Sequence, residues 1–200
     1  MLIEDAKTAD RSEAETTAEC LTTLSRGVIE GDTAEAVLLL LRDGTEIKKA
    51  FVMRGLQLAK SFAPAVEARL VEIVRSVEPQ DYDSHYFFYF LASRWAPKSD
   101  AVVDVMLDTA GTGKGQIDAI VRGFATGLTD AQRDRAASKL LDFVENAGSP
   151  YARQALLETL AKIAGASHVA RLEAIAANPN ADADTKKLAA TAAKAAGSRR

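Results

Sequence analysis

The chain contains little cysteine, little proline and no long hydrophobic run, and each shortage excludes a class of protein. Among its 200 residues there is one cysteine, Cys20, so no intrachain disulfide and no cysteine-based zinc site can form. Five prolines and the lack of alternating apolar and polar residues disfavour a β-sandwich or barrel. The apolar run at residues 36–41 has six residues, far fewer than the roughly 20 that cross a bilayer.

An excess of charge of either sign is also missing. The chain carries 25 Lys and Arg against 28 Asp and Glu, a formal net charge of −3. Phosphate contacts dominate the affinity of nucleic-acid binders, which usually have a basic domain, so this balance disfavours that function. The N-terminus is acidic where a signal peptide would be basic, and one cysteine suits a reducing compartment. We therefore expect a soluble, cytoplasmic protein that does not enter a membrane.

Alanine is abundant, with 38 copies in the chain and 17 of them in the last 50 residues. Alanine loses no side-chain entropy in a helix, and apolar residues recur at helical spacing along nearly the whole chain. These features predict an all-α protein. The expected helices cover residues 12–26, 33–42, 45–58, 64–78, 83–95, 97–108, 116–126, 129–146, 149–164, 167–177 and 182–196.

The spacing of the expected helices suggests a repeat. Alternate helices begin about 34 residues apart, a period typical of helical hairpin repeats. Short connections make consecutive helices antiparallel, and stacked hairpins bury one continuous core. We predict a flexible N-terminal segment, residues 1–11, followed by a single helical-repeat domain over residues 12–200. Pro97 and Pro150 are expected at the first turns of their helices, where the missing N–H costs nothing.

Residues 149–177 carry the clearest repeat pattern and resemble a HEAT-like repeat. The apolar and basic positions of its two helices are Arg153, Ala155, Leu156, Leu160, Ala161 and Ile163 in the first, and Val169, Leu172 and Ile175 in the second. This resemblance implies a right-handed α-solenoid of about five antiparallel hairpins. HEAT-like proteins are mostly protein-binding scaffolds, with a few enzymes and nucleic-acid binders among them. A tetratricopeptide array has a similar period, but its Trp, Leu-Gly and Tyr pattern is missing here.

Three sequence features resemble chemical sites, but each is better explained by a role in the fold. The glycine-rich stretch 111–115 lacks the spacing of a phosphate-binding loop and is expected to be a turn between helices. Asp81, Asp83 and His85 could ligate a metal, but acidic residues at a helix start are ordinary caps. Cys20 lies in an apolar helical setting and is expected to be buried. We predict no metal site and no cofactor.

Aromatic residues are concentrated on one helix, since seven of the twelve lie between residues 82 and 95. At helical spacing, one face carries Phe87, Phe88, Leu91 and Trp95 and should form core. The opposite face carries our candidate binding residues, Tyr82, His85, Tyr86 and Tyr89. Tyrosine offers a large contact area with a polar end, which suits an interface. The alternative is that neighbouring helices bury this face too.

Three functions remain open. The leading one is a non-enzymatic protein–protein interaction module (an adaptor, regulator or immunity-type inhibitor) that binds a partner protein through a solenoid face, with no obvious small-molecule ligand. The second is HEAT-like nucleic-acid binding or DNA repair. It requires several cations to converge, namely Arg122, Arg133, Arg135, Lys139, Arg153 and Arg171. The third is a small-molecule enzyme or lyase that uses Tyr82, Asp83, His85 and Tyr86 in a pocket on the 82–95 helix.

Overall fold

The computed structural model describes residues 11–42, 45–76, 82–111, 121, 123–147 and 149–199. Within these ranges the protein is all-α, with ten α-helices, two 3-10 turns and one pair of two-residue strands. The chain divides into two compact units, Met1–Val105 (unit 1) and Met106–Arg200 (unit 2). The prediction of a single repeat domain stays a prediction.

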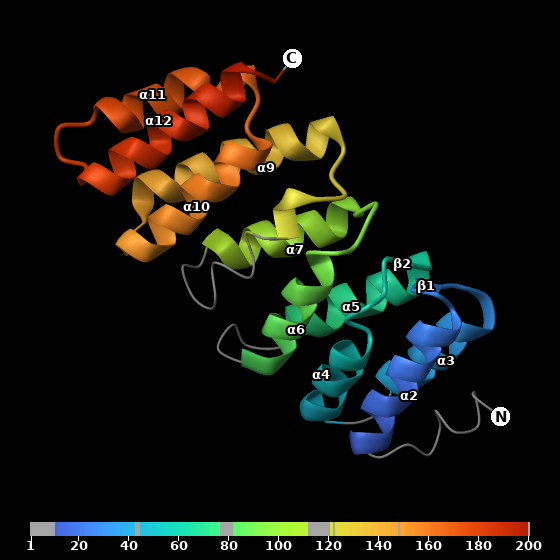
Figure 1. Cartoon of the computed structure of the whole chain (residues 1–200). Helices are drawn as coiled ribbons and strands as arrows, with labels where there is room; N and C mark the ends of the chain where they lie inside the picture. The colour runs from blue at the N-terminus through green and yellow to red at the C-terminus, as the bar shows by residue number, and fades with distance from the viewer. Residues whose placement is uncertain are drawn as a thin grey trace. The chain divides into compact units, whose positions relative to one another are not determined.

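Unit 1 consists of helices and one minimal parallel sheet. Its elements are α2 (Arg11–Leu24), β1 (Val28–Ile29), α3 (Gly31–Arg42), α4 (Glu46–Gly55), β2 (Ser61–Phe62), α5 (Pro64–Ser76) and α6 (Tyr82–Ala92), followed by α7 (Asp100–Gly111), within which the unit boundary falls. Helices that are two apart in chain order pack on each other: α2 on α4, α4 on α6, and α3 on α5 (Figure 1). Because the strands are two residues long, no alternating pattern in the sequence could reveal them.

A close approach between α2 and α4 depends on Gly55. A Cβ atom at this position would lie 2.4 Å from the backbone oxygen of Glu15 and 2.8 Å from Cβ of Ala18. Only a residue without a side chain fits there, so the glycine sets the distance between the two helices. Arg54, the preceding residue, pairs with Glu15 at 3.1 Å on the surface of the same contact.

Aromatic rings fill the interior of unit 1. Trp95 and Phe88 are buried, and the Trp95 ring lies 4.6 Å from that of Phe62 and 6.2 Å from that of Phe88. Ile29, Phe62 and Trp95 are each separated by 33 residues, and all three are buried. These three residues therefore occupy equivalent places in three successive connections between helices.

Unit 2 is built from α9 (Asp130–Asn146), α10 (Pro150–Ile163), α11 (Val169–Ala177) and α12 (Ala183–Gly197), with 3-10 turns η1 (Gly123–Ala125) and η2 (Ala166–His168). α9 packs on α10 and α11 on α12, and helices two apart in the chain also pack, mainly α10 on α12 and less extensively α9 on α11 (Figure 1). Small side chains line these contacts. The fully buried alanines of unit 2 are Ala136, Ala137, Ala164, Ala189, Ala192 and Ala196.

Local signals placed several helix starts correctly. Thr45, Thr129 and Asp182 each accept a hydrogen bond from a backbone N–H in the first turn of α4, α9 and α12. At α9 the cap is reciprocal, because the Gln132 side chain accepts from the Thr129 N–H at 3.0 Å. Ser149 precedes α10, as predicted, but its side chain makes no cap bond.

The predictions for Pro97 and Cys20 were wrong. Pro97 does not begin a helix: it follows a cis peptide bond, and α7 begins at Asp100. The Ser99 hydroxyl accepts from the Val102 N–H at 3.4 Å and therefore supplies the cap that marks the true start. Cys20 is exposed rather than buried, because the apolar stripe of α2 runs through Ala14, Ala18 and Leu21.

Candidate interaction surface

The four predicted binding residues all lie on α6, and the structure describes two of their side chains. Tyr89 is 2% exposed and meets the Phe88 ring edge-on at 5.7 Å, so it belongs to the core. Tyr86 is half-buried beside Phe87, with ring centroids 5.5 Å apart. The side chains of Tyr82 and His85 lie outside the described residues. A binding role for the stripe stays a prediction, and it cannot use the buried ring of Tyr89.

The opposite face of α6 is core, as predicted. Phe88, Leu91 and Trp95 are at most 1% exposed. Phe87, expected with them, is only half-buried. The guanidinium of Arg54 covers this position, at 6.0 Å from the Phe87 ring centroid and 5.7 Å from that of Phe51. The half-buried rings of Phe51 and Phe87 are thus already in contact with an arginine of unit 1.

A different surface of unit 1 is formed by the connections that follow α2, α4 and α6. We call residues 24–28, 57–61 and 93–96 the connection edge. Backbone hydrogen bonds join the three connections in order: the Lys60 N–H donates to the Gly27 oxygen at 2.8 Å, and the Ala96 N–H donates to the Lys60 oxygen at 3.0 Å. The parallel pair β1–β2 is part of this ladder, with Val28 opposite Ser61 (Figure 1). The connection edge is therefore hydrogen-bonded and ordered by its neighbours.

Large apolar side chains are exposed on the connection edge. Leu24 is 65% exposed, Leu58 59% and Val28 42%. Their backbones belong to adjacent segments, since a Cβ on Gly27 would lie 3.0 Å from the Leu58 backbone oxygen. A single exposed leucine is ordinary, but several on adjacent segments make this edge a candidate interaction surface. Sequence reasoning missed them because it assigned Leu58 to a helix.

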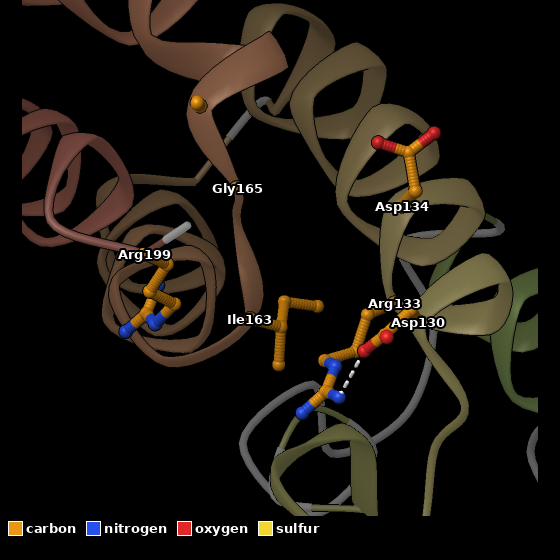
Figure 2. Close-up of a pocket in the computed structure, with 7 residues that line it drawn as sticks. Asp130, Arg133, Asp134, Ile163, Gly165 and Arg199 are labelled. Atoms are coloured by element: carbon orange, nitrogen blue, oxygen red, sulfur yellow. Dashed lines mark hydrogen bonds and ion pairs between the residues drawn. The ribbon is translucent and has the colours of Figure 1, made fainter.

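Unit 2 contains a pocket of about 460 Å³ between the start of α9 and the end of α10. Asp130, Arg133 and Asp134 line one side, and Ile163 and Arg199 line the other (Figure 2). Arg133 pairs with Asp130, and Figure 2 marks this contact. Arg199 donates to the backbone oxygens of Ala161 and Ala164. Both guanidinium groups are thus already used by the fold, which favours a structural role for the pocket walls.

His168 lies beside this pocket, 4% exposed, in a network with two serines and a carboxylate. The Gly165 N–H donates to Nδ1 at 3.2 Å, so in the neutral ring Nε2 carries the proton. Nε2 faces the Ser138 hydroxyl at 3.1 Å and Asp134 at 3.6 Å. A hydrolytic triad needs an unprotonated nitrogen toward the serine and a carboxylate on the other nitrogen. This network instead ties α9 to η2.

The remaining chemical candidates gain no support. Asp81 and residues 112–115 lie outside the described residues, as does the side chain of Asp83. In the part of the chain that the structure describes, no group of three or more His, Cys, Asp or Glu could hold a metal ion. Searched over the same residues, no helix has the length and apolar character needed to span a membrane.

Comparisons with known proteins identify the fold alone. No protein-family model and no curated protein matches the chain. Among solved structures, the chain is similar to the crystal structure of an engineered protein determined by the Northeast Structural Genomics Consortium. The two are 13% identical over 97% of this chain and 94% of the other, with a TM-score of 0.55. At this identity the likeness concerns the fold and carries no function.

Proposed function

We propose that this protein is a HEAT-like α-solenoid that binds another protein through the connection edge of unit 1. The exposed Leu24, Val28 and Leu58 carry the proposal, because a protein partner would remove their apolar surface from water. Their segments are held by backbone hydrogen bonds, so little conformational entropy is lost when a partner binds.

Repeated packing supports the solenoid part of this proposal. In each unit the helices pack on the next but one, as stacked hairpins do. Contacts between residues about 30 to 38 positions apart recur in both units. The Thr22 hydroxyl lies 3.5 Å from the Gly55 oxygen, and Ser167 donates to Asp134 at 3.0 Å. This spacing agrees with the period of about 34 expected from the sequence.

Nucleic-acid binding is less well supported, because several of the cations that it requires are paired in unit 2. Arg171 contacts Asp142 at 3.0 Å and Glu145 at 2.7 Å, and these two carboxylates raise its pKa. Arg133 pairs with Asp130. A cation paired with a carboxylate is less available to phosphate, since the pair would have to be broken.

A pull-down with matched variants tests the proposed function. The edge variant Leu24→Ser/Val28→Thr/Leu58→Ser removes the apolar surface, and Tyr151→Ser is its control because Tyr151 is a 63% exposed residue of unit 2. We expect wild type and Tyr151→Ser to retain the same stoichiometric partner from native lysate and the edge variant to lose it. Equal unfolding midpoints would establish that all three are folded. Retention of the partner by the edge variant would contradict the proposal.

A further inference from the structure

We infer that the partner segment bound by the connection edge is acidic as well as apolar, an inference that rests on the proposed function. Each connection carries one exposed cation: Arg26 after α2, Lys60 after α4 and Arg94 after α6. They are separated by 34 residues at each step. The repeat thus places a positive charge at a similar point in three adjacent connections.

The three cations lie on segments that touch one another. Lys60 is hydrogen-bonded through its backbone to both neighbouring connections, and its Cγ lies 3.4 Å from where a Cβ on Gly27 would be. Arg94 donates to the Gln57 oxygen at 3.2 Å, and its guanidinium lies 5.0 Å from the Phe90 ring centroid. Arg94 therefore reaches from the third connection to the second, which also carries Lys60.

These charges are available to a partner. Within the described ranges, the side chains of Arg26 and Lys60 make no ion pair and no hydrogen bond. Among the described residues, Arg94 contacts the neutral Gln57 carbonyl and the Phe90 ring. Neither contact neutralises its charge. Like charges on adjacent segments repel, and a carboxylate-bearing segment would relieve that repulsion.

The order of side chains along the edge favours a protein over a nucleic acid. Leu24, Arg26 and Val28 alternate apolar and basic, and Leu58 and Lys60 repeat the alternation. A segment with carboxylates between apolar residues would match both kinds of side chain. A nucleic acid would leave the aliphatic groups unused, and its affinity depends on more phosphate contacts than three cations provide. An acidic, amphipathic protein segment therefore fits best.

Selection of peptides from a random displayed library, with the full chain as bait, tests this inference. Binders are enriched on wild type and depleted on the Leu24→Ser/Val28→Thr/Leu58→Ser variant. The enriched peptides are then synthesised with a fluorescent label. Their Kd is measured on wild type, on the reversal variant Arg26→Glu/Lys60→Glu/Arg94→Glu and on a control, Lys139→Glu/Lys187→Glu/Lys194→Glu. The control reverses three exposed lysines of unit 2 and changes the net charge by the same amount.

We expect the enriched peptides to be rich in Asp and Glu between apolar residues. The reversal variant should bind them about tenfold more weakly or worse, and added salt should weaken wild-type binding, because exposed charge pairs are screened. The control variant should bind as wild type does. Neutral or basic peptides, or equal losses in both charge variants, would overturn the inference and leave the proposed function standing.

Two further outcomes have separate meanings. If a labelled 20-nucleotide single strand displaces the peptides and loses its own binding on the reversal variant, the edge is a nucleic-acid surface and the inference is wrong. If no peptide depends on Leu24, Val28 and Leu58, the proposed function itself fails, and the inference falls with it. Thermal unfolding of each variant distinguishes these results from loss of fold.

Discussion

Unit 1 fills its interior with aromatic rings, whereas unit 2 fills its interior with leucine and alanine. Trp95, Phe88 and Tyr89 are buried in unit 1, and the buried aromatic residue in the described part of unit 2 is Phe124. Alanine at contacts lets helices approach closely, and its high helix propensity keeps α12 helical. Bulky rings instead fill the space between the elements of unit 1. The two units thus reach a buried core with different residues.

The surfaces of the two units also differ, in how many of their charges are paired. Unit 1 exposes apolar and unpaired basic groups on its connection edge. Unit 2 pairs many of its charges, with Arg171 between two carboxylates and Arg153 within 3.7 Å of Asp182. Surface pairs of this kind add little stability, typically about 0–1 kcal/mol each. They do reduce the charge offered to a partner, so the unpaired cations of unit 1 are the more available ones.

The largest effect should come from Trp95→Ala. Removal of a fully buried aromatic side chain typically costs about 3–5 kcal/mol, because transfer energy is lost and a cavity remains. Trp95 also contacts Phe62. The substitution therefore removes the third of the equivalent buried side chains Ile29, Phe62 and Trp95. Hydrogen exchange followed by mass spectrometry should show loss of protection mainly in unit 1 peptides. Equal loss in unit 2 peptides would show that the two interiors are not separate.

Gly55→Ala should have the next largest effect. The added Cβ would meet the backbone of α2 at 2.4 Å, and backbone cannot move aside as a flexible side chain can. Overpacking of this kind costs about 1–3 kcal/mol. Urea unfolding of the purified variant measures the loss.

Gly197→Ala is the matched control for the glycine substitution. Gly197 is the last residue of α12, and its nearest contact to an added Cβ would be Cγ2 of Val169 at 3.8 Å, an ordinary van der Waals distance. Alanine is favoured over glycine in helices, so stability should stay equal or rise by up to about 1 kcal/mol. If both glycine variants lose stability equally, the close approach of α2 and α4 is not the cause.

Lys98 should make the stability of the protein depend on pH. Burial lowers the pKa of its ammonium from 10.5 to about 8, and the group donates to the Trp95 oxygen at 2.7 Å. Below about pH 8 the cost of burying the charge is fully present. Between about pH 8 and 10.5 the unfolded chain binds more protons, so the free energy of unfolding rises with pH, by up to about 1 kcal/mol per unit.

Lys98→Met removes the titrating group and isolates this effect. The free energy of unfolding, measured in urea from pH 7.5 to 10.5 for both proteins, should rise more steeply in wild type than in the variant. Tyrosine and the other lysines titrate in both proteins and cancel in the difference. Parallel curves would mean that Lys98 keeps an ordinary pKa in the folded protein.

The smallest expected losses of stability come from substitutions at the residues that precede α9 and α10 in unit 2. Thr129→Ala should cost about 1 kcal/mol, because it removes the side-chain acceptor of the α9 capping box. Ser149→Ala at α10 should cost less, since the Ser149 side chain makes no cap bond. Thermal unfolding of the two variants and of Thr129→Ser measures the difference. A larger loss at Ser149 would contradict the assignment of the caps.

Local chemistry made much of the helix map predictable. Thr129 and Asp182 cap helices where expected, because capping depends on residues within one turn. Pro97 failed because proline also suits the residues before a helix, and Ser99 offered a competing cap. The strands β1 and β2 were unpredictable, since their pairing joins residues 33 positions apart.

The candidate site was harder to predict than the helices. Its aromatic residues are evident in the sequence, but which tyrosine is buried depends on where α4 and the connections pack against α6. Tyr89 and Tyr86 have similar local surroundings and differ in exposure. The exposure of Leu58 depends on α4 ending at Gly55, three residues before it.

The sequence by itself determined that the protein is all-α, where several of its helices begin and that its charge is balanced. These properties depend on helix propensity, on caps and on composition, all of which act over a few residues. Only the tertiary structure decided that Gly55 brings α2 and α4 into contact, that Tyr89 belongs to the core, and that three connections share one edge. Burial and adjacency are set by contacts between residues more than 30 positions apart, and local sequence does not specify those contacts.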